Sequence, residues 1–328
     1  MSILCHSVDT LQAALVKYTK EERQFLEEGL HPGHPGSLFQ PITVHSDSNW
    51  ISSHPEEPQS FERFYRDPRR RKLDTSHNTI YIQTIGEEYC KAFFSGLSVK
   101  LLPAVTVAET RCSFRVNDNS QNLEILTGDL LQFLWNKKSK DAFCIVGITL
   151  IDLYPNESWN FISTLCVGMG VFSFARYDDE FYSRPYAGRL RKSRRPKQDD
   201  YSLFDGYHIP PITSTMLLRS CKTMAHEIGH IYHCQWLTCV MQGSNHLEES
   251  DRRPLDFCPI SLRKLQTAVG FDIGKRYKAL LEWIENDHTN SGGEASACQA
   301  VPKPTEAFHT FRMWLCRCLD TLGQKEDV

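Results

Sequence analysis

The segment HEIGHIYHCQWLTC, residues 226–239, constrains this chain more than any other feature of its sequence. It begins inside a run, 213–237, whose apolar residues recur at helical spacing. On a helix, His226 and His230 project from one face, one turn apart, where two imidazoles can hold a single zinc ion. Glu227 lies beside the first histidine, placed to take a proton from a zinc-bound water rather than to bind the metal. The segment therefore predicts a helix that carries a hydrolytic zinc site.

The composition excludes several classes of protein. The net charge of the 328-residue chain is only -3, so the chain as a whole is no general polyanion binder. No apolar run reaches the roughly 18 residues of a membrane helix, and the N-terminus has neither a basic start nor a long apolar segment. We therefore expect an intracellular protein, cytoplasmic or nuclear, that is not secreted and has no membrane partner.

The twelve cysteines support the same compartment. Only Cys234, Cys239 and Cys258 crowd together beside histidines. Reduced, buried thiols in an intracellular protein are the expectation for four cysteines that lie singly in apolar runs. These four are Cys90, Cys112, Cys144 and Cys166.

The chain divides into three segments by composition. Residues 1–75 form an N-terminal extension, with a helical pattern followed by a linker rich in proline and glycine. Residues 76–290 form the main domain, and residues 291–328 form a linker and a C-terminal helix. Strand patterns cover 79–85, 99–108, 111–117, 142–154, 160–168 and 170–177. Helical patterns cover 87–97, 123–138, 213–237, 259–272, 273–286 and 305–322. This mixture predicts an α/β (α+β) fold with a mixed sheet.

A basic stretch interrupts the main domain at 184–197, which holds seven Lys or Arg and no acid. A nuclear-targeting signal or a nucleic-acid patch is one interpretation. A solvated loop is the favoured interpretation, because no aromatic stacking platform accompanies the charges. Nucleic acid is therefore not the expected partner.

The motif continues beyond HEIGH with the pair His233 and Cys234, then Cys239, Met241 and Cys258. Together these residues resemble the signature of the archaemetzincin family, and the resemblance is densest from 213 to 271. It implies a metzincin-like fold, in which a mixed sheet lies above an active-site helix. It also implies two zinc ions, one catalytic and one structural, with the methionine in a turn beneath the catalytic metal.

Residue by residue, the resemblance assigns the two metals. It places the catalytic zinc on His226, His230 and His233, with Glu227 as general base. It places the structural zinc on cysteines, here Cys234, Cys239 and Cys258.

The third histidine departs from the family pattern. Only Ile231 and Tyr232 separate His230 from His233, as though three residues had been removed, the usual glycine among them. If the helix runs on, His233 lies roughly 7.5 Å along the axis from the midpoint of the first two histidines. Three alternatives remain open. The helix unwinds just after His230, another group completes the site, or zinc binds weakly. The candidate groups are His246, Glu248 and Glu249.

The structural metal shows a second departure, because Ser261 stands where the fourth cysteine is expected. A serine hydroxyl is a poor zinc ligand at neutral pH. Three thiolates would then need water, His246 or a more distant residue to complete the tetrahedron. The alternative is that these cysteines are plain buried thiols.

The sequence therefore predicts a zinc metallopeptidase that hydrolyses peptide or protein substrates with a zinc-activated water and Glu227 as base. A catalytically inactive zinc-binding relative that acts as a scaffold is the competing hypothesis. A third hypothesis is a nuclear or nucleic-acid protein that uses 184–197. Substrate specificity and oligomeric state stay open.

Overall fold

The structure is a computed structural model that describes most of the chain. The described residues are 18–28, 37–40, 42–54, 61–68, 74, 76–83, 87–156, 159–161, 163–166, 168–183, 186, 189, 200–231, 239–286 and 306–323.

A five-stranded sheet forms the centre, in the order β2-β1-β5-β9-β8. Its strands are β1 (Thr79–Gln83), β2 (Ser98–Leu102), β5 (Ala142–Thr149), β8 (Ser163–Cys166) and β9 (Met169–Ser173). All neighbours are parallel except β8, which runs antiparallel to β9 at the edge. Every residue of β1 and β9 is buried, which explains why these strands are apolar without alternation.

A second, four-stranded sheet has the order β3-β4-β6-β7. Its strands are β3 (Phe114–Val116), β4 (Leu123–Leu126), β6 (Asp152–Asn156) and β7 (Trp159–Phe161). The central pair, β4 and β6, is parallel, and both outer pairs are antiparallel. The prediction of a mixed α/β fold is thus confirmed.

Four local predictions were wrong in part. The strand patterns expected over 142–154 and 160–168 are each divided between the two sheets, as β5 and β6 and as β7 and β8. The helix expected over 123–138 begins only with α6 (Thr127–Lys137), because the four residues before it pair on both sides as β4. Burial of Glu124 suits that strand, since its carboxylate accepts from Arg115 Nε at 2.7 Å. The strand expected over 99–108 ends at Leu102, and α5 (Val107–Thr110) follows. Thr106 and Glu109 form a capping box that starts this short helix.

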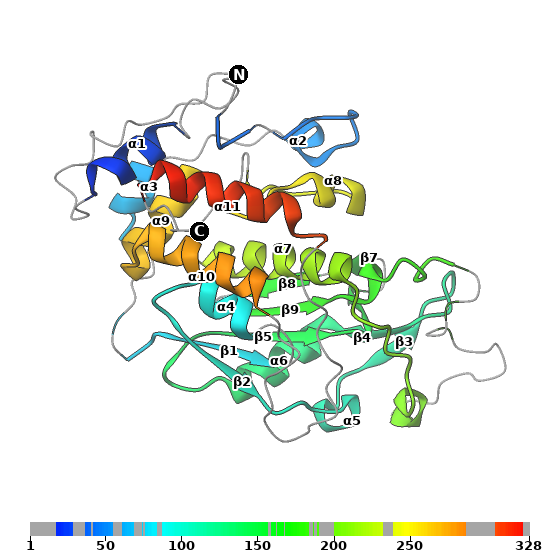
Figure 1. Cartoon of the computed structure of the whole chain (residues 1–328). Helices are drawn as coiled ribbons and strands as arrows, with labels where there is room; N and C mark the ends of the chain where they lie inside the picture. The colour runs from blue at the N-terminus through cyan, green and yellow to red at the C-terminus, as the bar shows by residue number, and fades with distance from the viewer. Residues whose placement is uncertain are drawn as a thin grey trace.

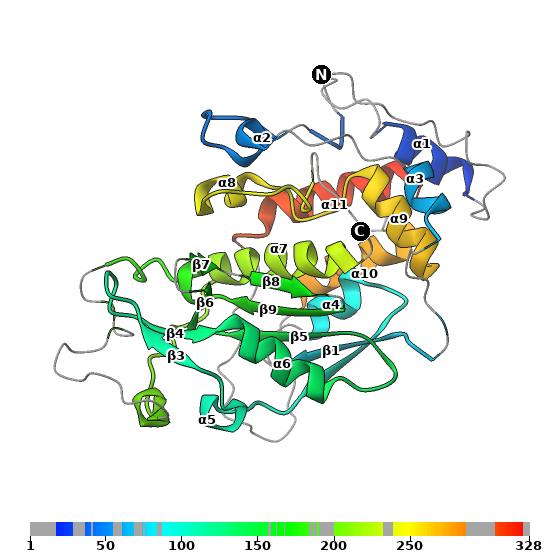
Figure 2. The ribbon, with the colours of Figure 1, turned by 180° about the vertical axis from the view of Figure 1, so that it is seen from behind.

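Helices cover both faces of the central sheet. Figure 1 shows α7 (Ser214–Ile231) along one face and α6 along the other. The turned view in Figure 2 shows the same layers. Helix α7 packs on strands β8 and β9 of the central sheet, and it also contacts α4 (Glu87–Phe93). The helix with the HEIGH motif therefore lies directly against the sheet.

Other helices form a layer on the side of α7 away from the sheet (Figure 1). They are α1 (Lys20–Glu28), α2 (Trp50–Ser53), α3 (Phe61–Arg66), α8 (Leu247–Arg252), α9 (Pro259–Val269) and α11 (His309–Thr321). The helix α10 (Ile273–Glu285) lies beside α7 and packs on α4 and α11. Aromatic rings join this layer: Phe25 contacts Phe39 and Tyr277 with ring centroids 5.4 and 5.8 Å apart. The ring of Trp314 lies 5.4 Å from that of Tyr277. Described parts of 1–75 and 291–328 therefore share one hydrophobic core with 76–290, and the three-segment division stays a prediction.

Three of the four singly placed cysteines, Cys90, Cys112 and Cys144, are free and buried as expected. The side chain of Cys166 lies outside the described part of the structure, as does most of the basic stretch 184–197. Tyr186 of that stretch is buried, with its ring 5.2 Å from that of Phe181. Among the helices that the structure describes, none is long and apolar enough to span a membrane.

Candidate functional site

Two histidines of α7 converge. The Nε2 atoms of His226 and His230 are 3.0 Å apart, and their rings meet edge to face with an interplanar angle of 89°. The helix explains this, because residues four apart lie one above the other on one face. Two nitrogen ligands at about 2.0–2.1 Å from a tetrahedral zinc ion lie about 3.3 Å from each other. The pair therefore has the spacing of two zinc ligands.

A backbone carbonyl orients His226. The oxygen of Val240 lies 2.8 Å from His226 Nδ1, and because a carbonyl can only accept, the Nδ1 proton is donated to it. The lone pair then resides on Nε2, which faces His230. Burial, followed by the charges of Arg253 and His230, lowers the pKa of His226 well below its usual value. The neutral ring that results is the form that binds a metal.

Met241 lies beneath the helix in a tight turn. Its side chain is 1% exposed and packs against Gly229, the residue before His230. A Cβ added at Gly229 would overlap Met241 Sδ and would come within 3.1 Å of Phe257 Cε1. The glycine in HEIGH is therefore required by this close approach.

Glu227 is buried beside the pair, with 8% of its surface exposed. It lies near Arg253, which is buried at 6% exposure and follows α8. Burial lowers the pKa of Arg253, and neighbouring groups that include the Glu227 carboxylate act in the opposite direction. The carboxylate is thus positioned on the same helix as both histidines.

Two other predicted metal ligands lie outside the part of the chain that the structure describes. His233 and Cys234 lie in 232–238, outside the described residues, and α7 is helical up to Ile231. Across the ranges that the structure describes, no three His, Cys, Asp or Glu form a group that could hold a metal. The structure therefore brings two of the predicted catalytic ligands together.

The three alternative ligands are engaged elsewhere. His246 Nδ1 accepts from the backbone of Glu249 at 3.2 Å and caps α8. Glu249 accepts from the backbone of Trp50 at 2.8 Å, and Glu248 accepts from Arg252 Nε at 2.8 Å. None of the three is brought to His226 and His230 within the described part of the chain.

Cys239 and Cys258 form a buried thiol pair, and both are free of disulfides. Burial raises the pKa of Cys239, and the hydrogen bond with Cys239 lowers the pKa of Cys258. Ser261 is fully buried, and its Oγ lies 3.5 Å from Cys258 Sγ. The structure thus brings together Cys239, Cys258 and the serine that stands in the place of the fourth cysteine.

A buried arginine that no motif marks supports the turn. Arg276 is 0% exposed, and its Nη1 and Nη2 donate to Asp256 Oδ2 and Oδ1 at 3.0 and 2.8 Å. The backbone oxygen of Asp256 accepts from Val240 N at 3.0 Å, so the ion pair braces the residue that orients His226. The sequence gives one clue that Arg276 is buried, because it falls on the apolar face of α10, four residues before Leu280.

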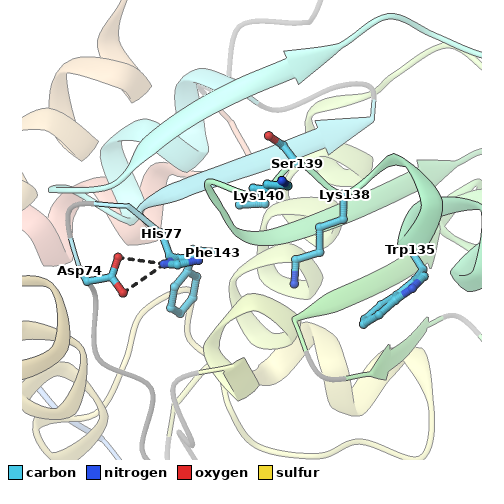
Figure 3. A pocket seen from close by; sticks show the side chains of 8 residues that line it. Asp74, His77, Trp135, Lys138, Ser139, Lys140 and Phe143 are labelled. Carbon is cyan, nitrogen blue, oxygen red and sulfur yellow. Dashed lines mark hydrogen bonds and ion pairs between the residues drawn. The ribbon is translucent and has the colours of Figure 1, made fainter.

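A separate pocket of about 560 Å³ opens at the end of α6 (Figure 3). Figure 3 shows Lys138 reaching between Phe143 and Trp135. Asp74 and His77 pair at the end of the pocket opposite Trp135, with Asp74 Oδ1 and His77 Nδ1 2.9 Å apart. Its lining residues come from 74–77, the end of α6, the following turn and the start of β5, so it lies apart from the histidine pair.

Comparisons with known proteins agree with this geometry. Residues 212–267 match the model of peptidase family M54. The chain is 51% identical to archaemetzincin-2 of Macaca fascicularis and 50% identical to that of Homo sapiens, in each case over 98% of this chain and 99% of the relative. Human archaemetzincin-1 is 36% identical over 82% of this chain and 58% of that relative.

Among solved structures, the crystal structure of archaemetzincin from Methanopyrus kandleri is 20% identical. It covers 61% of this chain and 99% of that chain, with a TM-score of 0.39.

The mixed α/β fold, the histidine pair on a buried helix and the match over 212–267 together indicate the class of proteins described by the M54 family model. By its identity over nearly the whole length, the chain belongs to the archaemetzincin family. The human archaemetzincin-2 alignment runs over 360 positions, against 328 residues here. That relative therefore has residues without a counterpart in this chain.

Proposed function

We propose that this chain is a zinc metallopeptidase that hydrolyses peptide bonds in peptide or protein substrates. His226 and His230 hold the catalytic zinc through Nε2, and His233 supplies the third ligand. The observation that carries the proposal is the convergence of the two Nε2 atoms at 3.0 Å, with His226 held by the Val240 carbonyl. Family membership supports the same chemistry.

The donor set fits zinc, because neutral imidazole nitrogens are among its preferred ligands. When bound, zinc lowers the pKa of its water toward 7 and polarises a peptide carbonyl. Glu227 then takes the proton of the attacking water on its carboxylate and returns it to the departing amine nitrogen. Burial of this carboxylate beside His226 keeps bulk water from competing for that proton.

A second zinc site on Cys234, Cys239 and Cys258 is part of the proposal. Its support is the buried pair Cys239 and Cys258. With Ser261 beside Cys258, only three thiolates are available, so this site binds zinc less tightly than a site with four cysteines. The expected metal content is therefore below two zinc ions per chain after mild chelation.

A catalytically inactive zinc-binding scaffold is the second candidate. It is favoured by the short spacing, because α7 is helical through Ile231 and only Tyr232 precedes His233. A helix that ran on would carry His233 away from the metal held by the first two histidines.

Metal analysis combined with peptide hydrolysis tests the proposal. Elemental mass spectrometry would compare the wild type with His226→Ala/His230→Ala and with Cys239→Ala/Cys258→Ala. We expect each double variant to lose a different part of the bound zinc, and the histidine variant to lose all hydrolysis. If the histidine variant keeps the zinc content of the wild type, the proposed catalytic site is wrong. Zinc loss without any wild-type hydrolysis would favour the scaffold.

A further inference from the structure

An N-terminal segment, residues 43–54, lies on residues 243–252, the loop that follows the Met241 turn and contains the short helix α8. The indole of Trp50 rests on Gly243, where an added Cβ would come within 2.5 Å of Trp50 Nε1. Figures 1 and 2 both show α2, which begins at Trp50, beside α8. Two regions whose hydrogen-bonded residues are 192 to 209 positions apart in sequence are thus in direct contact.

Glu249 forms the centre of this contact. Its carboxylate is 1% exposed and accepts from Trp50 N at 2.8 Å and from Asn245 N at 2.8 Å. Asn245 Nδ2 in turn donates to the backbone oxygen of Ser48 at 2.8 Å. Hydrogen bonds to a buried carboxylate are stronger than neutral ones, so this junction resists opening.

The far end of the loop is held as well. Arg252 Nη2 donates to Asn49 Oδ1 at 3.1 Å, and Arg252 Nη1 donates to the backbone oxygen of Thr43. Asn49 is 1% exposed, and its Nδ2 lies 3.3 Å from His246 Nε2. Contacts with 43–54 therefore extend along the loop 243–252 from its first residue to its last.

Both ends of this loop continue into residues that flank His226. Gln242, just before the loop, accepts on its backbone oxygen from Arg253 Nη1 at 2.7 Å. Arg253, just after the loop, also places Nη1 3.2 Å from His226 Nδ1. A displacement of the loop would therefore reach Gln242 and Arg253 together, and with them the carbonyl of Val240 that orients the ring.

We propose that residues 43–54 act as a strap that holds the loop 243–252 in place and thereby keeps His226 oriented. Trp50 and Glu249 are its positioning residues: neither touches the reacting atoms, and both act through the loop. The effect on zinc rests on the proposed function, whereas the effect on the loop and on His226 is independent of it.

The experiment compares full-length Trp50→Ala, Trp50→Phe and Glu249→Gln with the wild type. Trp135→Ala is the matched control, because Trp135 is 58% exposed at the end of α6 and lies far along the chain from the loop. Hydrogen exchange of backbone amides in 239–253 reports on the loop, with amides of α10 as the internal reference. The rate of carbethoxylation at His226, mapped by mass spectrometry on metal-free protein, reports on the histidine. Competition with a chromogenic chelator gives the zinc affinity.

For Trp50→Ala and Glu249→Gln we expect amide exchange in 239–253 to be about tenfold faster, with α10 unchanged. His226 should react faster, and zinc should bind about tenfold more weakly. Trp50→Phe should recover part of each effect, and Trp135→Ala should match the wild type.

Unchanged amide exchange in the loop of Trp50→Ala and Glu249→Gln would overturn the proposed strap. Faster amide exchange in the loop with unchanged reactivity of His226 would show that the strap does not control the orientation of His226. Absence of zinc binding in the wild type would count against the proposed function alone, since the first two readouts still decide the strap.

Discussion

Met241 packs against Gly229 so closely that the helix carrying both histidines has no room for a side chain at that position. Phe257 borders the same spot, and Met241 and Phe257 belong to one hydrophobic core. Because Gly229 has no side chain, the helix that carries His226 and His230 can pack closely on the Met241 turn.

Replacing Gly229 by alanine should destabilise the protein by about 1–3 kcal/mol, because the new methyl group overpacks the core. Alanine favours a helix over glycine by about 1 kcal/mol, so the overlap must exceed that gain. Gly128→Ala is the control, since nothing lies within 4 Å of a Cβ built at that position of α6. Urea unfolding measures both variants. A Gly229→Ala protein as stable as Gly128→Ala would mean that Met241 moves aside at no cost.

Glu227→Gln should lower peptide hydrolysis by at least about 10²-fold, because the amide cannot take a proton from the attacking water. Zinc content should stay close to that of the wild type, since Glu227 is not a proposed ligand. Glu285→Gln serves as the control, because that carboxylate is exposed on α10 and pairs with Arg312. Turnover of a mixed peptide library and elemental analysis are the two measurements. Equal hydrolysis by wild type and Glu227→Gln would remove this residue from the mechanism.

We expect that an insertion of three residues between Tyr232 and His233, the first of them glycine, raises both zinc affinity and peptide hydrolysis. Glycine adopts positive φ readily, so the helix could end and His233 could fold back toward the other two histidines. Three alanines are the control, because they favour a continued helix and move His233 further along it. Library hydrolysis and zinc affinity would be compared among the three proteins. If the wild type already cleaves as well as the glycine insertion, the short spacing is competent.

Arg276→Met should destabilise the fold by about 3–5 kcal/mol, because it leaves Asp256 buried without its partner. Arg312→Met is the matched control, since Arg312 pairs with Glu285 at side-chain exposures of 42% and 41%. That surface pair should contribute at most about 1 kcal/mol. Urea unfolding of the two variants gives the comparison, and similar losses in both would argue against a structural role for the buried pair.

Lys222 predicts a pH dependence of stability. Burial lowers its pKa from 10.5 to about 8, although Nζ donates to the backbone oxygen of Asp251 at 2.7 Å. Between about pH 8 and 10.5 the unfolded chain therefore binds a proton that the folded chain lacks, so this group makes stability rise with pH. Below pH 8 both states are protonated and the full penalty, about 3 kcal/mol, remains.

Lys222→Met should therefore be more stable than the wild type at pH 7, and this advantage should shrink as the pH rises toward 10. Urea unfolding of both proteins at pH 7, 8, 9 and 10 measures it, and the difference between them cancels the titration of other groups. A constant difference across that range would show that Lys222 keeps an ordinary pKa in the folded protein.

The sequence alone determined the features that depend on local geometry. A spacing of four residues places His226 and His230 on one face of any helix, and the apolar pattern of 213–237 is long enough to identify that helix. The compound motif from His226 to Cys258 was likewise sufficient to indicate the family, because its residue types and spacings are all contained in one short stretch.

Only the tertiary structure decided the features that depend on distant partners. Residues 123–126 continue a helical pattern, yet they form a strand because β3 and β6 pair with them on both sides. The carbonyl of Val240, the Arg276 brace and the contact of Trp50 with Gly243 have no periodic signature, since each joins segments that are separate in sequence. The physical reason is that periodicity records which face of an element is buried, whereas the identity of the covering group is settled by packing.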